Sequence, residues 1–290
     1  MLQVSTRQKV KGYFDTRQGG RPENQDSCAS IDTQYGLLVL ICDGMGGGPA
    51  GKLASTTAIK TIDGFLKEYT PEVQEKSSSI LIKAIECAHE NIIKLAESDE
   101  SRKGMGTTIA AILVNKGAAI LAHVGDTRIY QYRHKKRIFR TKDHSLVGEL
   151  VRNGTLTEEQ ARLSSQSNII TRALGTKDSR TDIDIRPYKK GDRFMICSDG
   201  IWGMYPEKEL INLTASSDAL DDIVYKMVEN TDAKGFSSGG HHDNLTIALI
   251  EMDENSILKD RKSKKWISVM CIVVAFLMAI SFLVVFVLFN

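Results

Sequence analysis

Three aspartates lie at the ends of short apolar segments, each followed by glycine or asparagine: Asp43, Asp199 and Asp243. Short aliphatic segments bounded by glycine are typical of buried strands. A carboxylate at the end of such a strand loses hydration, which is costly unless a partner neutralises its charge. A simple turn could explain any one of them. Three together favour a shared pocket of negative charge, and the usual partner of such a pocket is a hard divalent cation.

The elements that must position these aspartates follow from hydrophobic spacing. Apolar residues recur every three or four positions over 54–69, 81–95 and 219–228, which predicts helices. Strands are predicted at 107–114, 118–124, 128–133, 137–141 and 245–250. The connections between the middle strands are too short for parallel crossovers, so these strands should pair as antiparallel neighbours. Because the helices are grouped rather than alternating with strands, the sequence predicts an α+β layered sandwich.

Composition narrows the possible functions. The 290 residues are 42% hydrophobic and 26% charged, as in an ordinary globular protein. The net charge of +2 is too small to indicate a nucleic-acid partner. The five cysteines show no CxxC or similar ligand spacing, which favours buried thiols in a reducing compartment over a zinc site.

The C-terminal part of the sequence predicts a membrane anchor. Residues 266–289 contain no charged side chain, and at about 1.5 Å per residue a helix of that length exceeds the roughly 30 Å hydrocarbon core. A basic cluster lies just before it, which by the positive-inside rule keeps that end in the cytoplasm. We therefore expect a catalytic domain at 1–252, a charged juxtamembrane linker at 253–265 and one transmembrane helix, with the catalytic domain on the cytoplasmic side of the cell membrane.

Eight polar segments occur in series between about Lys11 and Ile250. They are Arg21–Asp26, Asp43–Gly48, Gly104–Thr108, Val124–Arg128, Thr141–Ser145, Asn168–Gly175, Cys197–Gly200 and Asp243–Asn244. In order and approximate spacing they resemble the metal-dependent protein phosphatase 2C family in its bacterial form. The resemblance implies a four-layer α-β-β-α sandwich with two central antiparallel sheets. It also implies a serine/threonine phosphatase that hydrolyses phosphoserine and phosphothreonine by attack of water activated by two metal ions.

The resemblance assigns a role to each candidate ligand. Asp43 would bridge the two metals, and Asp199 and Asp243 would complete the first site. The carbonyl of Gly44 would ligate the second metal, which Asp26 would support partly through water. Such a set of oxygen ligands suits Mn²⁺ or Mg²⁺.

Two further residues carry roles by resemblance. Asp126 matches the aspartate that, with Asp199, can hold a third and weaker metal. Arg21 matches the phosphate-binding arginine, whose guanidinium offers two donors to phosphate oxygens; a surface ion pair between Arg21 and Asp26 is the alternative. Met45 stands where animal relatives carry a histidine proposed as general acid, and a thioether cannot donate a proton.

Several other expectations remain open at this level. His241 and His242 flank Asp243 and could supply the missing acid, although a supporting or solvated pair is the simpler interpretation. The polar stretch 145–180, with two possible short helices, could be a substrate-facing flap or a surface excursion. The resemblance also suggests phosphoproteins and a bacterial Hanks-type kinase as partners. A membrane-tethered pseudophosphatase and a metal-dependent nuclease are the alternatives, the latter disfavoured by the lack of a basic groove.

Overall fold

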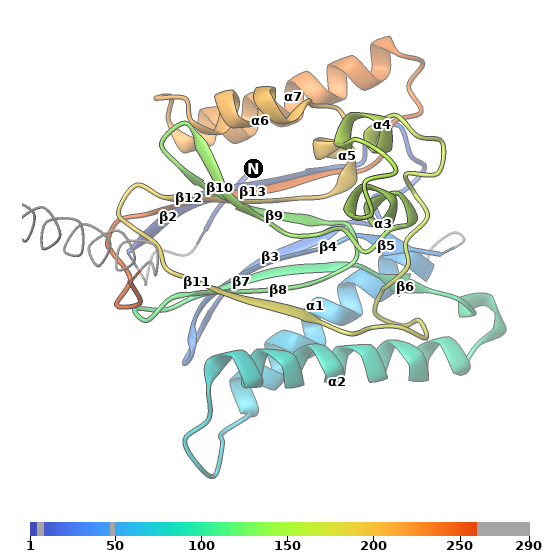
Figure 1. Ribbon diagram of the computed structural model, residues 1–290. Coiled ribbons are helices and arrows are strands. Elements are labelled where there is room, and N and C mark those ends of the chain that lie inside the picture. Colours follow the sequence, from blue (N-terminus) through green and yellow to red (C-terminus); the bar gives the residue numbers. More distant parts are fainter. Residues whose placement is uncertain (5–8, 47–49, 260–290) are drawn as a thin grey trace, which may run out of the picture.

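Two antiparallel sheets form the centre of the protein, and helices cover their outer faces (Figure 1). The computed structural model describes residues 1–4, 9–46 and 50–259. The six-stranded sheet has the order β1 (Leu2–Gln3), β2 (Val10–Arg17), β13 (Leu245–Met252), β12 (Arg193–Cys197), β9 (Arg128–Arg133), β10 (Lys136–Arg140). The five-stranded sheet has the order β11 (Asp182–Arg186), β8 (Ala119–Val124), β7 (Ile109–Val114), β4 (Gly36–Cys42), β3 (Ser27–Thr33).

Helices form the two outer layers. The five-stranded sheet is covered by α1 (Ala50–Glu68) and α2 (Ser77–Glu97), which pack on each other, and η1 (Glu100–Arg102) follows them. The six-stranded sheet is covered by α5 (Asp199–Trp202), α6 (Glu207–Thr214) and α7 (Leu220–Ser237), as Figure 1 shows. The short helices α3 (Leu146–Arg152) and α4 (Glu158–Arg162) lie at one end of the sandwich, beside a two-stranded ribbon of β5 (Gly44–Met45) and β6 (Gly106–Thr107).

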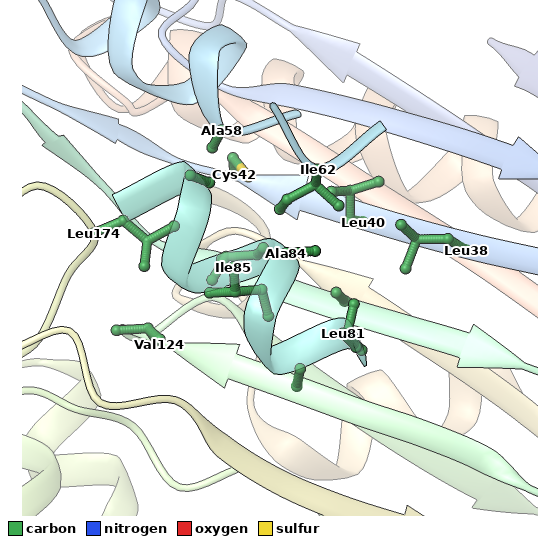
Figure 2. Packing of buried hydrophobic residues seen from close by; sticks show 14 of the residues in the cluster. Leu38, Leu40, Cys42, Ala58, Ile62, Leu81, Ala84, Ile85, Val124 and Leu174 are labelled. Atoms are coloured by element: carbon green, nitrogen blue, oxygen red, sulfur yellow. The ribbon is translucent and has the colours of Figure 1, made fainter. Parts of the chain in front are cut away.

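Three buried clusters hold the four layers together. One lies between the two sheets, and one packs α7 and α5 against the six-stranded sheet. The third packs α1 and α2 against the five-stranded sheet, with Ala58 and Ile62 facing Leu38 and Leu40 of β4 (Figure 2). Every residue of β4 is buried because both faces of that sheet are covered, which explains its continuous apolar sequence.

The predicted α+β sandwich with two antiparallel sheets is confirmed. The helices expected at 54–69, 81–95 and 219–228 are α1, α2 and α7. The strand expected over 107–114 is interrupted at Thr108, which leaves the ladder to pair with Asp43: the Thr108 N–H donates to the Asp43 carbonyl at 2.8 Å. The hydrophobic pattern did not identify β2, β3 and β11. In these strands the alternation of apolar and polar residues is either irregular or only a few residues long.

The predicted membrane anchor falls on residues outside the described part of the chain. Residues 260–290 include the second half of the expected linker, 260–265, and all of the expected helix at 266–289. Among the residues that the structure describes, no helix has the length and apolar character needed to cross a membrane. The anchor therefore stays a prediction.

Candidate active site

Strand register brings the candidate aspartates to one end of the sandwich, here called the aspartate edge. Asp43 follows β4, Asp199 begins α5 directly after β12, and Asp243 precedes β13. Cys197 of β12 lies opposite Ile247 of β13, so Asp199 and Asp243 come from neighbouring strand ends. Asp43, Asp126, Asp199 and Asp243 line a single cavity of about 580 Å³, which Arg21, Met45, Asn168 and Ile170 also line.

The backbone of Asp43 is held on both sides by β6–β7. Its N–H donates to the Thr108 hydroxyl at 3.0 Å, and its carbonyl accepts from the Thr107 hydroxyl at 2.9 Å. Desolvation raises the pKa of Asp43 well above its usual range, and the charges of Asp26 and Asp199 raise it further. This carboxylate therefore resists ionisation until a cation accompanies it.

Gly44 lies where the chain turns from β4 against the start of α1. A Cβ at this position would lie 2.1 Å from the Gly51 carbonyl oxygen and 2.8 Å from the Gln25 carbonyl oxygen. Only glycine fits between these two backbone segments. The expected ligand carbonyl of Gly44 thus belongs to a tightly packed part of the aspartate edge.

Asp26 lies beneath the cavity and is only 1% exposed. Its Oδ2 accepts from the Ser198 hydroxyl at 2.9 Å, while its Oδ1 has no protein partner. Desolvation raises the pKa of Asp26 to about 6, although hydrogen bonds from Thr246 and Ser198 oppose the shift. The alternative of a surface ion pair between Asp26 and Arg21 is not observed, because Arg21 Nη2 donates to Asp243 Oδ2 at 2.7 Å.

Asn244 organises the loop that carries Arg21. Its Nδ2 donates to the carbonyls of Gln18 and Glu23 at 2.7 and 3.0 Å, and its Oδ1 accepts from the Gln25 N–H at 2.9 Å. The side chain therefore ties residues 18–25 to the start of β13. The sequence showed Asn244 only as the neighbour of Asp243, and no local spacing indicates a contact between positions so far apart in the chain.

Asp126 is 2% exposed and lies in the turn between β8 and β9. Its Oδ1 has no protein partner, and desolvation raises its pKa to about 7. The turn requires Gly125, whose φ is +109° and whose Cβ would lie 2.6 Å from the Thr108 side chain. Trp202 of α5 donates its Nε1 hydrogen to the Asp126 carbonyl at 3.0 Å.

These observations fit a site for divalent cations. Four carboxylates line one cavity, the buried Asp26 acts electrostatically on Asp43, and each of Asp26, Asp43, Asp126 and Asp199 has a pKa raised by burial. Two of the buried oxygens lack any protein partner. Carboxylate and carbonyl oxygens without sulfur or imidazole match the preference of Mg²⁺ and Mn²⁺.

Among the described residues, the group whose possible ligand atoms all lie within 4.8 Å of one another is His123, His144 and Asp182, and the carboxylates of the aspartate edge are not gathered that tightly. The two imidazole rings are stacked, with 4.5 Å between centroids and 16° between planes, so one ion cannot lie in both ring planes. His144 Nδ1 accepts from the Gly125 N–H, which places its proton on Nε2, 3.1 Å from Asp182. The group is therefore a weaker metal candidate than the aspartate edge, and as a hydrogen-bond network it holds the Gly125–Asp126 turn.

The remaining candidates occupy supporting positions. Met45 lines the cavity, as does Asn168 of the stretch 145–180. His242 Nε2 interacts with Asp232 of α7 at 2.8 Å, so this ring belongs to the helical layer, whereas His241 is exposed. The stretch 145–180 contains the two short helices that were expected, α3 and α4.

Comparison with known proteins agrees with this geometry. The family model described as "Protein phosphatase 2C" matches residues 16–246. The chain belongs to the protein phosphatase 2C family. It is 34% identical over 236 residues to the serine/threonine phosphatase stp of Listeria welshimeri, covering 80% of this chain and 88% of that protein. It is 32% identical to the protein phosphatase PhpP of Streptococcus pneumoniae, covering 81% and 94%.

Solved structures of bacterial phosphatases have the same fold. The serine/threonine phosphatase of S. agalactiae superposes with a TM-score of 0.75 at 32% identity, over 84% of this chain and 99% of the other. The catalytic domain of the phosphatase PstP, solved with two manganese ions, gives a TM-score of 0.70 at 26% identity, over 83% and 97%. This protein is a metal-dependent serine/threonine protein phosphatase of the 2C family.

Proposed function

We propose that the aspartate edge of this phosphatase holds two Mn²⁺ or Mg²⁺ ions, with Asp43 shared between them. Asp199 and Asp243 complete the first site, and the Gly44 carbonyl and Asp26 serve the second. Asp126, with Asp199, offers a third and weaker site. The observation that supports this assignment best is the convergence of these carboxylates, with raised pKa values and unpartnered buried oxygens.

The bound metals would neutralise the carboxylates, activate a water for attack on phosphorus and stabilise charge on the phosphoryl oxygens. The side chains of the protein hold and orient the substrate. Arg21 already points into the cavity, where its Nη2 contacts Asp243, and from there its guanidinium can donate to a phosphate oxygen. Met45 cannot donate a proton, so we expect the leaving alkoxide of the phosphoserine or phosphothreonine to take its proton from solvent.

The substrates are phosphorylated proteins, as the family implies, and we propose that a Hanks-type serine/threonine kinase supplies them. We also propose that residues 266–289 anchor the protein in the cell membrane, with the phosphatase on the cytoplasmic side. The uncharged stretch and the preceding basic cluster support this placement. No observation favours a pseudophosphatase or a nuclease.

Hydrolysis of a soluble phosphothreonine peptide by the full chain, with Mn²⁺ and with chelator, tests the proposal. We expect Mn²⁺-dependent turnover that falls by about 10³-fold in Asp199→Asn, since lost metal stabilisation of roughly 4 kcal/mol corresponds to that factor. Asp222→Asn, an equal charge change on the exposed side of α7, serves as the matched control. Turnover unaffected by chelator, or retained in Asp199→Asn, would contradict the assignment.

A further inference from the structure

The chain leaves the sandwich at the end opposite the aspartates. Asp243 and Asn244 precede β13 at the aspartate edge, and Asp253 follows β13 at the other end. At about 3.3 Å per residue, the eight residues of β13 separate these two ends by roughly 26 Å. Figure 1 shows the red segment after β13 on the side of the sheets away from β5 and β6. Residues 253–258 are called the exit segment here.

The exit segment is bound to both sheets. The N–H groups of Ile257 and Leu258 donate to the carbonyls of Lys116 and Gly117 in the β7–β8 turn, each at 2.9 Å. Ser256 exchanges hydrogen bonds with the backbone of Tyr188, whose own hydroxyl donates to the Asn115 carbonyl at 2.9 Å. These bonds continue the path of the chain along the sheet ends, so the segment cannot swing freely from Met252 onward.

Lysines surround the exit segment. The carbonyls of Lys9 and Lys116 accept from backbone N–H groups of the segment. The Lys190 N–H donates to Asn255 Oδ1, and Lys11 pairs with Asp253. The exposed lysines that form this surface, here called the exit-edge lysines, are Lys9, Lys11, Lys116, Lys189, Lys190 and Lys259. The acidic residues of the segment, Asp253 and Glu254, are each 3.3 Å from a lysine.

Besides Asp253 and Glu254, Glu251 lies near this end of β13, where it pairs with Arg193 at 2.7 Å. Further acidic side chains lie in the outer helical layer. Asp218, Asp221 and Asp222 lie at or just before the start of α7, beside the loop that Arg193 contacts. The six exit-edge lysines outnumber Asp253 and Glu254, the two acidic residues of the exit segment. Lysines that lie within a Debye length of an anionic bilayer surface are attracted to it.

The chain between the exit segment and the predicted membrane helix is short. From the bound Leu258 to Trp266 the chain takes eight steps, which span at most about 27 Å at roughly 3.4 Å per residue. That reach only equals the roughly 26 Å length of β13, and a path around the outside of the domain is longer. If residues 266–289 cross the bilayer, the domain cannot be inverted while the exit segment stays bound.

We propose that the end of the sandwich bearing the exit-edge lysines faces an anionic bilayer, so that the aspartate edge opens away from the membrane. The inference rests on the membrane anchor proposed above. It places the catalytic cavity tens of ångströms from the lipid surface. The enzyme then acts on phosphorylated residues that extend well into the cytoplasm and discriminates against phosphorylated residues close to the bilayer.

A spacer assay tests this orientation with the full chain in vesicles that contain phosphatidylserine. Two lipid-anchored phosphothreonine peptides are compared, one with a Gly/Ser spacer of about 5 residues and one of about 40. The short spacer extends to roughly 17 Å at most, whereas the long one has a root-mean-square reach of about 35 Å. We expect the short-spacer peptide to be hydrolysed at least about 10-fold more slowly, because a tether that cannot span the distance gives almost no effective concentration.

Three variants sharpen the result. A Gly/Ser insertion of about 30 residues between Leu258 and Lys259 frees the domain and should bring the two rates together. The double substitution Lys116→Glu and Lys190→Glu should weaken the contact with the bilayer. The difference in hydrolysis rate between the short-spacer and long-spacer peptides should therefore become smaller. Lys60→Glu with Lys94→Glu, an equal charge change on α1 and α2, is the matched control and should leave the difference unchanged.

The outcomes separate the underlying proposals. A soluble phosphothreonine peptide reports the phosphatase itself and the folding of every variant; no Mn²⁺-dependent hydrolysis of it would contradict the proposed function. A chain that does not float with vesicles would overturn the anchor, and with it the orientation. Equal rates on both tethered peptides, with the soluble peptide hydrolysed and the chain on the vesicles, would overturn the orientation alone.

Discussion

Two buried aspartates near each other in the sequence have opposite environments. Asp143, 6% exposed, accepts from Arg128 at both carboxylate oxygens, with distances of 2.6 to 3.2 Å. Asp126, 2% exposed, leaves one oxygen with no protein partner. Burial alone would raise the pKa of both groups. The charge and hydrogen bonds of Arg128 outweigh burial at Asp143 and lower its pKa, whereas the pKa of Asp126 rises to about 7.

The same contrast divides the two ends of the sandwich. Asp192, at the end away from the aspartate edge, is fully buried and accepts from Arg133 at 2.7 and 2.8 Å and from Gln131 at 3.0 Å. A carboxylate with a structural role thus receives an arginine from a neighbouring strand. At the aspartate edge, Arg21 pairs with Asp243. We infer that a divalent cation compensates the negative charge of the other carboxylates there.

Asp43→Asn should give the largest effect. We expect Mn²⁺-dependent kcat/KM to fall by at least about 10³-fold, since a ligand shared between two metals is lost. In chelator the same variant should be more stable than the parent by about 1 kcal/mol at pH 8, because the parent's Asp43 loses its proton readily only on unfolding, whereas asparagine carries no such penalty at high pH. Steady-state kinetics measures the change in kcat/KM, and urea unfolding with chelator measures the change in stability. A loss of stability in chelator would place Asp43 with Asp143 among the structural aspartates.

Asp143→Asn should act in the opposite way on stability. It leaves the buried Arg128 without its carboxylate, which typically costs about 3 kcal/mol in unfolding free energy. The double variant Arg128→Met with Asp143→Leu should recover much of that loss, since no buried charge remains. Urea unfolding with and without Mn²⁺ provides the measurement. A loss below about 0.5 kcal/mol would show that the two aspartates differ less than their contacts suggest.

The metal-free protein should lose stability as pH rises. A carboxyl group whose folded pKa lies above its unfolded value of about 3.9 binds its proton more tightly in the folded state. Its contribution is complete below that value and is lost as pH rises through the folded values, about 6 for Asp26 and about 7 for Asp126. Thermal melts in chelator between pH 5 and 8 should therefore show a falling Tm, and saturating Mn²⁺ should remove the fall. A Tm that rises with pH in chelator would contradict the raised values.

Trp202→Phe should give the smallest effect. It removes the hydrogen bond to the Asp126 carbonyl, worth about 1 kcal/mol, while keeping an aromatic ring beneath Arg128, 3.5 Å from the guanidinium carbon. We expect about fivefold weaker occupation of the third metal site, seen as a shift in the Mn²⁺ dependence of activity. Phe139→Leu, which removes an aromatic ring from beneath Arg186, is the control and should not shift it. An unchanged Mn²⁺ dependence in Trp202→Phe would show that Trp202 does not support the third metal site.

The local pattern of apolar and polar residues explains which features the sequence could predict. The strands β4, β12 and β13 are continuous apolar segments, so their aspartate ends were visible without any tertiary information. The interruption at Thr108 was not visible, because it arises from hydrogen bonds to Asp43 across the fold. Arg21 was weighed as a partner of nearby Asp26, yet it contacts Asp243, 222 positions away. Proximity in the sequence was misleading there because β13 pairs with β2.

The sequence alone predicted oxygen ligands for a divalent cation, since the aspartates, the glycines and the apolar strands before them can be recognised within a few positions. It also determined the family, because eight segments occur in order. Only the tertiary structure decided which carboxylates receive an arginine and which remain for a cation. Only the tertiary structure shows that the exit segment is hydrogen-bonded to the β7–β8 turn, at the end opposite the aspartates. These outcomes depend on strand register, which pairs residues far apart in the chain and follows from packing of the whole sandwich.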